Sequence, residues 1–485
     1  MYRSTIKKTC TSTRGVAILA SMTRRELLQA MGLTAAGAFT PKELLTWDAH
    51  ESTPQDPGLP TPKGIDYKPL DRPIRVLIAG YGNRGGYYGS FQSQLKSEFQ
   101  VVGVADPVDY KRANATRIHN LDPKNVVTTW EHLFDRPKFA DAVLVSTPDH
   151  LHYGPAMAAL NAGYDLILEK PIAQTWRECS DILALARKKN AIVGVCHVLR
   201  YAPYFVQMKE VVRSGMIGDV VSIQHMEPIH YLHFAHSYVR GIWRNEKQSN
   251  PSLLAKSCHD LDILRWVIDA PCERVSSFGS LKYFRDEYAP KGAPTHCMDG
   301  CPIENSCIYH AAQVYVHKKL WGWGHIETSN RTDQGILEAL RKGQYGKCVF
   351  KNDNTVVDHQ VVNMQFAGNV TAAFSMEAMT SYGGRKTRIM GTKGDIVGDE
   401  RFLDVYDFEN RKAIRWDVNQ AFGNLDGHGG GDIRLCKDFC HAVARRDETI
   451  LTSNLTESME SHLIGFQAEK SRNSGGQVQT VKMPR

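Results

Sequence analysis

The stretch that decides the fold runs from residue 75 to residue 85 and reads RVLIAGYGNRG. After Arg75, residues 76–79 form an apolar run typical of a buried strand, and a G-x-G-x-x-G pattern follows. The first glycine permits a tight turn, the second lets a pyrophosphate approach the backbone, and the third lets the next helix pack closely. We therefore expect a strand–turn–helix unit that binds a dinucleotide through Gly80, Gly82, Asn83, Arg84 and Gly85.

Asp106 strengthens this interpretation, because it ends a second apolar run about twenty residues further on. An acid at this point accepts hydrogen bonds from an adenosine ribose and repels a 2′-phosphate, which favours NAD over NADP. Lys111 and Arg112 follow closely enough to weaken the preference, so NADP remains the alternative.

Two different patterns divide the chain near residue 200. Before it, apolar strands at 74–79, 101–105, 142–146, 165–168 and 192–196 alternate with helices at 85–96, 151–161 and 175–189, which predicts a doubly wound parallel sheet. After it, longer and more polar strands predict a mostly antiparallel sheet with one solvated or ligand-facing side. Those strands are expected at 220–226, 275–284, 356–366, 370–377, 386–390 and 403–407, and helices at 252–268, 431–445 and 456–470.

Composition excludes several classes of protein. With 485 residues, 42% of them hydrophobic and 23% charged, the chain is typical of a soluble protein of two or three domains. No run of eighteen uncharged apolar residues is present, so we expect no membrane span. The formal charge is +7, but the first forty residues carry six Lys or Arg and one acid, which leaves +2 for the rest and predicts no nucleic-acid partner.

The N-terminal region resembles a twin-arginine export signal. Arg24 and Arg25 precede two leucines and a mildly apolar run at 30–39; an amphipathic helix that merely contains two arginines is the alternative. We expect a signal at 1–46, an extended Pro- and Gly-rich linker at 47–72, a Rossmann domain at 73–200 and a second domain at 201–485. The protein is then periplasmic or extracytoplasmic, and cytoplasmic if the signal interpretation is wrong.

Polar residues follow two further strands of the predicted parallel sheet. Thr147, Pro148 and His150 come after one strand, and Glu169 and Lys170 after the next. Because doubly wound sheets bind ligands at the carboxyl ends of their strands, we expect these residues to contact the cofactor. Lys170 is placed to exchange protons with a substrate, the alternative being a solvated loop lysine.

The glycine loop, the turn TPDHLH at 147–152 and the triplet Glu169-Lys170-Pro171 together resemble the Gfo/Idh/MocA family of NAD(P)-dependent sugar oxidoreductases. The resemblance extends through RYAP at 200–203 and covers most of residues 73–470. It implies a Rossmann domain followed by an α/β domain with a large open sheet, in a homo-oligomeric enzyme acting on CH–OH groups. It also implies that Lys170 is the lysine that touches the substrate hydroxyl, and that Asp106 and His150 are cofactor contacts.

The second-domain signature of that family is an Asp four residues before a His, with another Asp three residues after it. His259 and Asp262 fit, but Ala255 replaces the first acid and Lys256 stands beside it. His259 is our acid–base candidate, because imidazole titrates near neutrality, and Lys256 is a candidate second cation. The alternative is a structural histidine on the helix 252–268.

The stretch 227–244 (EPIHYLHFAHSYVRGIWR) is rich in aromatic residues, His and Arg, which suits a carbohydrate pocket. A metal site at His233 and His236, or a loop with exposed rings, is the alternative. The substrate-binding residues that we predict here and in the RYAP segment are Arg200, Tyr201, His236, Tyr238, Arg240 and Arg244.

Cys297, Cys301 and Cys307 form a C-x3-C-x5-C cluster. With His296 or His310 they could hold Zn or an iron–sulfur cluster; one disulfide or free thiols are the alternatives. A glycine run at 427–431 contains His428 and either approaches the substrate or forms a flexible turn.

Together these patterns predict an oxidoreductase that transfers a hydride between a hydroxyl carbon of a sugar, sugar acid or glycoside and a tightly bound nicotinamide cofactor. One alternative is a redox-neutral glycosidase that works through a transient 3-keto intermediate. Ala255 motivates another, a non-catalytic sugar-binding protein.

Overall fold

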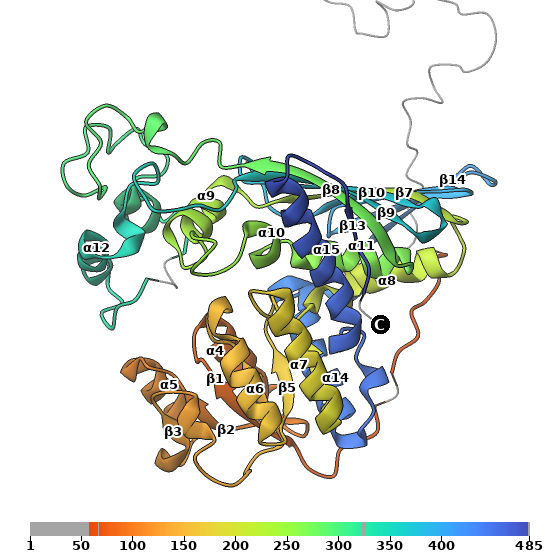
Figure 1. Cartoon of the computed structure of the whole chain (residues 1–485), viewed down its shortest axis with the longest axis horizontal. Helices are drawn as coiled ribbons and strands as arrows, with labels where there is room; N and C mark the ends of the chain where they lie inside the picture. Colours follow the sequence, from red (N-terminus) through yellow and green to blue (C-terminus); the bar gives the residue numbers. More distant parts are fainter. Residues whose placement is uncertain (1–57, 66, 323–325, 484–485) are drawn as a thin grey trace, which may run out of the picture. The chain divides into compact units, whose positions relative to one another are not determined.

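Two sheets organise the part of the chain that the computed structural model describes, residues 58–65, 67–322 and 326–483 (Figure 1). The predicted export signal and residues 47–57 of the predicted linker lie outside the described residues. Within 58–322 and 326–483, no helix is long and apolar enough to cross a membrane.

The first sheet is parallel and six-stranded, in the order β3-β2-β1-β4-β5-β6. Its central strand β1 pairs with β2 on one side and β4 on the other, as expected for a doubly wound sheet. All four residues of β4 and of β5 are buried, which explains why both are apolar except for Asp165 at the start of β5. The strands are β1 (Ile74–Ala79), β2 (Phe99–Ala105), β3 (Val126–Val127), β4 (Ala142–Val145), β5 (Asp165–Leu168) and β6 (Val193–Val195).

Helices connect these strands and cover the sheet (Figure 1). The sequence determines the ends of α7 clearly: Thr175 and Glu178 form a capping box at its start, and Asn190 ends it in the left-handed conformation with φ 50°. The connecting helices are α4 (Asn83–Ser90), α5 (Asp109–His119), α6 (Tyr153–Asn161) and α7 (Trp176–Lys189).

The second sheet has nine strands in the order β14-β13-β12-β11-β7-β10-β9-β8-β15, and every pair is antiparallel except β10 with β7. In β9, Val362 and Met364 are buried, whereas Val361 and Asn363 are exposed. This alternation gives the sheet one packed and one open face and confirms the predicted α/β architecture. Its strands are β7 (Val220–Pro228), β8 (Cys272–Ser280), β9 (His359–Phe366), β10 (Thr371–Glu377), β11 (Lys386–Gly391), β12 (Gly394–Gly398), β13 (Phe402–Asp407), β14 (Lys412–Asp417) and β15 (Gln479–Thr480).

Helices that follow residue 200 pack on the inner face of the second sheet. Figure 1 shows α8, α11 and α15 between the nine-stranded sheet and the Rossmann domain. The helix expected over 252–268 is broken in two by a turn at Lys256 and Ser257. The helices of this part are α8 (Pro203–Arg213), α9 (Tyr231–Phe234), α10 (Ser252–Ala255), α11 (Cys258–Ile268), α12 (Asp333–Lys342) and α13 (Val418–Phe422).

The last two long helices return to the first sheet. Leu435 and Phe439 of α14 (Gly427–Arg445) join the core formed by Val76 and Ile78 of β1. Leu455 and Met459 of α15 (Leu455–Asn473) join the core on the other face of the same sheet, beside α7 (Figure 1). The Rossmann domain is therefore completed by residues from the end of the chain.

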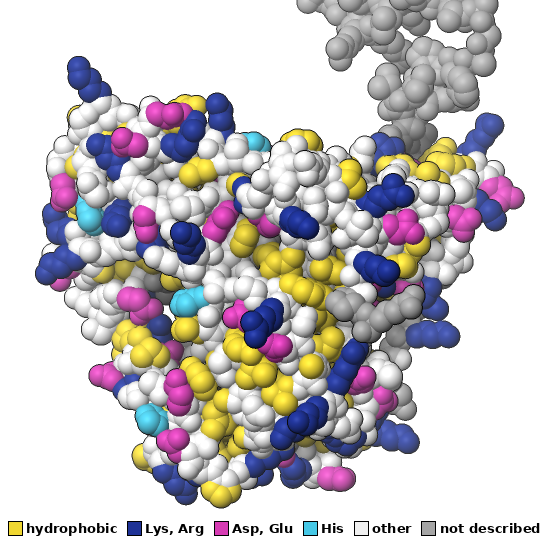
Figure 2. Space-filling view, in the orientation of Figure 1, with side chains coloured by type: hydrophobic (Ala, Val, Ile, Leu, Met, Phe, Trp, Pro, Cys, Tyr) yellow, Lys and Arg dark blue, Asp and Glu magenta, His cyan; other side chains and the backbone are white. Residues whose placement is uncertain are grey.

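The described part of the predicted linker has no helix or strand, but it is attached to the protein. The Tyr67 hydroxyl donates to Asp438 of α14, and the Gln207 side chain donates to the Pro60 carbonyl at 2.9 Å. On the face drawn in Figure 2, basic and acidic side chains are interspersed.

Candidate functional site

The turn after β1 is built around three glycines that serve different purposes. Gly80 has φ +94°, and a Cβ at this position would lie 2.7 Å from the Ser146 carbonyl oxygen. A Cβ at Gly85 would lie 2.0 Å from the Gly80 carbonyl oxygen, so helix and turn touch directly. Gly82 faces open space, and no side chain caps the first turn of α4. The turn therefore fits a pyrophosphate at the start of α4.

Asp106 holds this turn from the end of β2. One carboxylate oxygen accepts from the Tyr81 backbone N–H at 2.9 Å, and the other accepts from Val108 N–H at 2.9 Å. Each oxygen keeps a second lone pair, so the carboxylate fits the ribose hydroxyls of a dinucleotide. The Arg112 guanidinium donates to the Asp106 carbonyl oxygen at 2.5 Å and pairs with Asp109.

Arg84 connects the phosphate turn to two distant segments. Its guanidinium lies 2.6 Å from Glu169, at the end of β5, and 2.5 Å from Asp432 in α14. Burial would raise the pKa of both carboxyls, but Arg84, with Lys170 at Glu169 and His428 at Asp432, holds their pKa below the usual values. Arg84 and Glu169 thus lie beside the predicted cofactor site, and they bind protein side chains and the Lys170 N–H.

The turn 147–152 joins the two domains. His152, which the sequence analysis did not single out, lies with its ring nitrogens 2.7 Å from the Pro171 carbonyl and 2.9 Å from the Thr147 carbonyl. Asp149 accepts from the Trp243 indole at 3.0 Å. The Thr147 hydroxyl is buried without a hydrogen-bond partner among the described residues, and His150 is exposed.

Lys170 reaches from the Rossmann domain into the second domain. Its ammonium donates to the Ala255 carbonyl oxygen at 2.7 Å. That carbonyl ends α10, and the turn at Lys256 and Ser257 separates it from α11. Where the family signature has an acid, this chain therefore offers a main-chain oxygen to the lysine.

His259 lies one helical turn beyond Ala255, on α11. Its side chain is 3% exposed, and neither ring nitrogen has a hydrogen-bond partner within residues 58–322 and 326–483. Burial, and next the Lys170 ammonium and His428, lower the pKa of His259 well below its usual value. The imidazole is therefore neutral near pH 7 and able to accept a proton.

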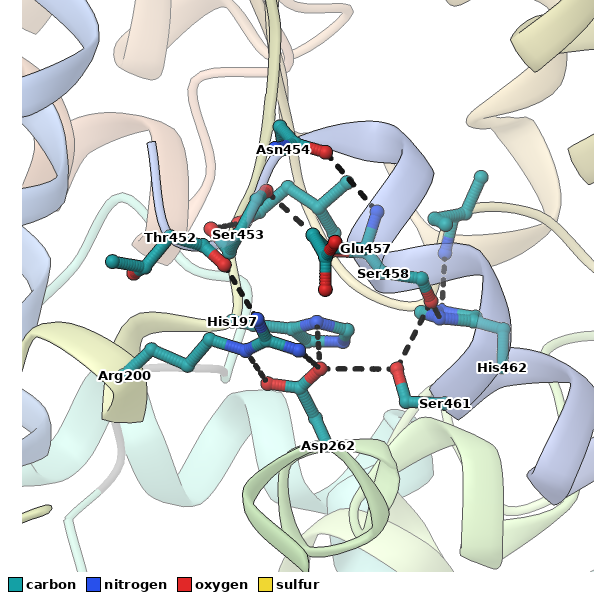
Figure 3. A network of polar contacts seen from close by, with 12 residues as sticks. His197, Arg200, Asp262, Thr452, Ser453, Asn454, Glu457, Ser458, Ser461 and His462 are labelled. Carbon is teal, nitrogen blue, oxygen red and sulfur yellow. Dashed lines mark hydrogen bonds and ion pairs between the residues drawn. The ribbon is translucent and has the colours of Figure 1, made fainter. Parts of the chain in front are cut away.

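A buried polar frame lies next to His259, whose ring centroid is 6.1 Å from that of His197. Figure 3 shows this frame around Asp262. Asp262 receives two hydrogen bonds of 2.7 Å from Arg200 and one of 3.0 Å from Ser461, and it lies 2.9 Å from His197. Burial would raise the pKa of Asp262, but Arg200 and His197 hold it far below its usual value. The Tyr201 hydroxyl lies 2.9 Å from Ser453 in the same frame.

These contacts place Arg200 and Tyr201 in the scaffold of the site, and their role as substrate-binding residues stays a prediction. His462 of α15 completes the scaffold: its Nε2 accepts from the Ile172 N–H at 3.0 Å, next to Lys170-Pro171. Burial, followed by the charge of His197, lowers the pKa of His462 to about 3.

Lys256 belongs to a second charge network. Its ammonium lies 3.1 Å from Glu227, whose other oxygen lies 2.9 Å from Arg385. Arg385 also lies 2.6 Å from Asp260, which in turn lies 3.0 Å from His225. The sequence analysis missed Glu227, Arg385 and Asp260, because only the packing of β7, β11 and α11 brings them together.

The aromatic stretch 227–244 packs against the segment 281–357. Arg240 is fully buried and donates at 2.7 Å to the carbonyls of Lys347 and Tyr309. Arg244 pairs with Asp353 at 2.7 Å. The remaining predicted contacts in this stretch also face side chains: His236 lies 2.9 Å from the Tyr315 hydroxyl, and Tyr238 stacks on Phe234. Sugar binding by these four residues stays a prediction.

The expected metal centre at Cys297, Cys301 and Cys307 is not found. The three line a small cavity together with Cys348, but all ten described cysteines are free thiols. Among the described residues, no group of three or more His, Cys, Asp or Glu is arranged to hold a metal ion. The geometry explains this result: the Arg240 guanidinium donates to Cys297 Sγ at 3.4 Å, and burial raises the pKa of the Cys307 and Cys348 thiols, which disfavours thiolates.

Comparison with known proteins decides the family. The model of an oxidoreductase family with an NAD-binding Rossmann fold matches residues 74–197, and the model of that family's C-terminal alpha/beta domain matches residues 209–480. The chain belongs to the Gfo/Idh/MocA family. It is thus an NAD-binding oxidoreductase, as the sequence motifs predict.

Among curated proteins, this Gfo/Idh/MocA chain is 25% identical over 389 residues to the putative oxidoreductase YteT of Bacillus subtilis, a match that covers 75% of this chain and 87% of YteT. It is 30% identical over 211 residues to inositol 2-dehydrogenase 1 of Saccharopolyspora erythraea, which covers 42% of this chain and 57% of that enzyme.

Solved structures confirm the fold of this Gfo/Idh/MocA chain. Levoglucosan dehydrogenase in complex with NADH matches with a TM-score of 0.64 at 17% identity, covering 85% of this chain and all (100%) of the other. The inositol dehydrogenase homolog from Azotobacter vinelandii, complexed with NAD+, matches with a TM-score of 0.62 at 16% identity, covering 85% and 98%.

Proposed function

We propose that the protein transfers a hydride between a hydroxyl carbon of a sugar, sugar acid or glycoside and a tightly held NAD. The observation that carries this proposal is the meeting of Lys170 and His259 at Ala255. Lys170, from the Rossmann domain, binds the Ala255 carbonyl, and His259, from the second domain, is close enough for the lysine charge to lower its pKa. A proton acceptor and a hydroxyl-binding cation are thus brought to one point.

The two side chains have complementary tasks. NAD, when bound, supplies the hydride acceptor. Lys170 uses one of its three N–H donors on Ala255, which leaves two for the oxygen of a substrate. His259 has an unpartnered, neutral ring that is able to take the hydroxyl proton. The names of curated relatives, inositol 2-dehydrogenase and 1,5-anhydro-D-fructose reductase, support a carbohydrate substrate.

A substrate panel tests this function. The purified protein is incubated with myo-inositol, levoglucosan, 1,5-anhydro-D-fructose and nitrophenyl glycosides, and NADH fluorescence and nitrophenol release are followed together. We expect a change in NADH with at least one non-glycosidic sugar, and its loss in Lys170→Ala. Release of nitrophenol without net NADH would instead establish the redox-neutral glycosidase. Sugar binding by calorimetry without any turnover would establish the non-catalytic protein.

Tight retention of the cofactor is supported by a contact across its expected adenosine end. Glu327, from the segment 281–357, lies 2.7 Å from the Lys111 ammonium and accepts from the Tyr110 hydroxyl at 2.6 Å. Both partners lie at the start of α5, close behind Asp106. The second domain therefore holds the segment that follows the ribose-binding acid.

We also propose that Arg24 and Arg25 direct export through the twin-arginine route, on the strength of the sequence alone. Residues 1–46 fused to a reporter should deliver it to the periplasm, and the double variant Arg24→Lys, Arg25→Lys should leave it in the cytoplasm. Periplasmic delivery of the double variant would contradict the proposal.

A further proposal is that two copies associate through the open face of the second sheet. Phe278 of β8 and Val361 of β9 are cross-strand partners on that face, 54% and 40% exposed. Sedimentation should show a dimer or tetramer, and Val361→Lys should shift it towards the monomer. Unchanged sedimentation of this variant would rule out association through the Phe278–Val361 pair.

A further inference from the structure

A third histidine reaches the site from the end of the chain. His428 lies at the start of α14, and its ring centroid is 5.4 Å from that of His259. Its Nδ1 lies 2.9 Å from Asp432, and its side chain is 32% exposed. His428 therefore lies next to His259 and also reaches the surface, whereas His259 itself is buried.

The backbone around His428 is built to place it there. Gly427, Gly429 and Gly430 all have positive φ, from 44° to 80°. A Cβ at Gly427 would lie 2.2 Å from the Tyr87 hydroxyl, and one at Gly431 would lie 2.0 Å from the Val198 carbonyl oxygen. Only glycine at these positions lets the chain pass between α4 and the turn at 198–201. The glycine run thus passes close to α4 at Gly427 and to the turn at 198–201 at Gly431, in a conformation that favours glycine.

Asp432 determines which nitrogen of His428 carries the proton. The carboxylate is 1% exposed, and Arg84 binds its other oxygen. Burial would raise its pKa, but the hydrogen bond with His428 and the charge of Arg84 keep it low, so the carboxylate is ionised and only accepts. Nδ1 of His428 is therefore the donor, and Nε2 is left to exchange protons.

A proton taken up by His259 needs a way out, because the ring is buried and unpartnered. The charged or titratable groups that act most strongly on it are Lys170, His428, Arg385 and His197. Lys170 is bound to Ala255, Arg385 lies among three carboxylates, and His197 is fully buried beside Asp262. Lys170 is also partly exposed, but the Ala255 carbonyl already holds its ammonium, so His428 is the one of these four groups that is placed to pass a proton from His259 to solvent.

We propose that His428 carries the substrate proton between His259 and solvent, with Asp432 as its positioning partner; this rests on the proposed function. The proton leaves the His259 imidazolium, directly or through one water, for Nε2 of His428, and then passes to water or buffer. No electrons are exchanged in this step, and in the direction of reduction the same path runs backwards.

The variant His428→Ala tests the relay with the panel substrate that the wild type turns over. We expect steady-state turnover to fall about a hundredfold and to recover as imidazole is added to the buffer. The first turnover should stay fast, because His259 still accepts that proton, and NAD affinity should not change. His132→Ala is the matched control, since this exposed histidine pairs with Asp135 of its own segment.

If His428 has only a structural role, His428→Ala should also lose the first turnover, and added imidazole should not restore its activity. This result would overturn the relay. Histidine-labelled NMR of the substrate-free protein gives an independent test: His428 should carry its proton on Nδ1, and a proton on Nε2 would also overturn it. If the wild type turns over no panel substrate, the proposed function fails and the relay with it. If the wild type is active and His428→Ala is equally active, the relay alone fails.

Discussion

The Lys170 ammonium binds a main-chain carbonyl where the family signature has a carboxylate. A carbonyl carries no charge, so it neither titrates nor pairs with a second cation. Lys256, the residue next to it, is neutralised elsewhere by Glu227. At the level of single residues the site thus keeps one free cation–imidazole pair, Lys170 and His259, and this pair should bear the chemistry.

We therefore expect Lys170→Ala and His259→Ala each to lower kcat by about a hundredfold or more. Titration should show NAD binding intact, because neither side chain belongs to the phosphate turn. Lys256→Ala is the comparison: its ion pair with Glu227 predicts a smaller effect. Near-normal turnover of both Lys170→Ala and His259→Ala would refute the mechanism.

The Asp106 carboxylate should make the protein prefer NAD to NADP. This carboxylate would lie against a 2′-phosphate in a partly buried setting, where repulsion is strong. Asp106→Ser should lower the ratio of the NADP dissociation constant to the NAD dissociation constant by about tenfold, which corresponds to about 1.4 kcal/mol of binding free energy. Tighter binding of NADP than of NAD by the unmodified protein would contradict this preference.

Among the structural elements, the phosphate turn has one glycine whose replacement should affect mainly NAD binding and another whose replacement should affect mainly stability. A methyl group at Gly82 meets nothing within 4 Å, whereas one at Gly85 would lie 2.0 Å from a backbone oxygen. Gly82→Ala should thus keep its melting temperature but bind NAD at least about tenfold more weakly. Gly85→Ala should lose about 2 kcal/mol of stability by overpacking. Equal NAD affinity in Gly82→Ala would show that the pyrophosphate does not approach there.

The element scale also shows what the sequence can predict. Unbroken apolar runs identify the parallel strands, with β5 correct to the residue, and the glycine spacing identifies the phosphate turn. The break between α10 and α11 leaves no sequence signal, because the apolar periodicity of Leu254, Leu261 and Leu264 continues across it. Tertiary packing makes that break, and with it the Lys170 contact.

The site was only partly predictable for the same reason. Lys170 and His259 lie in motifs, and in the structure the Lys170 ammonium binds the Ala255 carbonyl close enough to His259 to lower its pKa. The spacing of His428 and Asp432, four residues apart, is visible in the sequence, but their place beside Arg84 depends on α14 folding back to the first sheet. Arg240 resembles a ligand-binding arginine until the segment 281–357 is seen to cover it.

For the whole molecule, buried imidazoles predict how stability depends on pH. Burial lowers the pKa of His119 to about 4, and burial followed by the charge of His197 lowers that of His462 to about 3, against 6.5 in an unfolded chain. Below pH 6.5 these two histidines bind protons in the unfolded chain but not in the native state. Their contribution to the free energy of unfolding is therefore complete above pH 6.5 and is lost as the pH falls.

The urea midpoint should therefore drop between about pH 7.5 and about pH 5, and His119→Gln should flatten part of this slope. His132→Gln, at an exposed position, is the control and should leave the slope as it is. A midpoint that stays constant over this range would show that these rings are not buried in the neutral form.

Glu327 of the second domain contacts Tyr110 and Lys111 of the Rossmann domain. This contact between the domains predicts slow release of the cofactor. Glu327→Gln removes the charge of the contact and should raise the dissociation rate of NAD, measured by displacement with a fluorescent analogue. Glu338→Gln is the matched control, because Glu338 accepts a hydrogen bond from Gln334 within its own helix. Equal rates in Glu327→Gln and the wild type would contradict retention by this segment.

The return of α14 and α15 to the first sheet has a consequence for biosynthesis. Strands β1 to β6 leave the ribosome long before Leu435, Phe439 and Met459 are translated, yet these residues cover both faces of that sheet. At ordinary elongation rates the nascent sheet stays partly bare for on the order of tens of seconds, and such a surface is one that chaperones bind. Arg84 likewise meets Asp432 only when synthesis is almost complete. The cofactor turn therefore reaches its final form at the end of translation, although its glycines are among the first residues of the fold to be made.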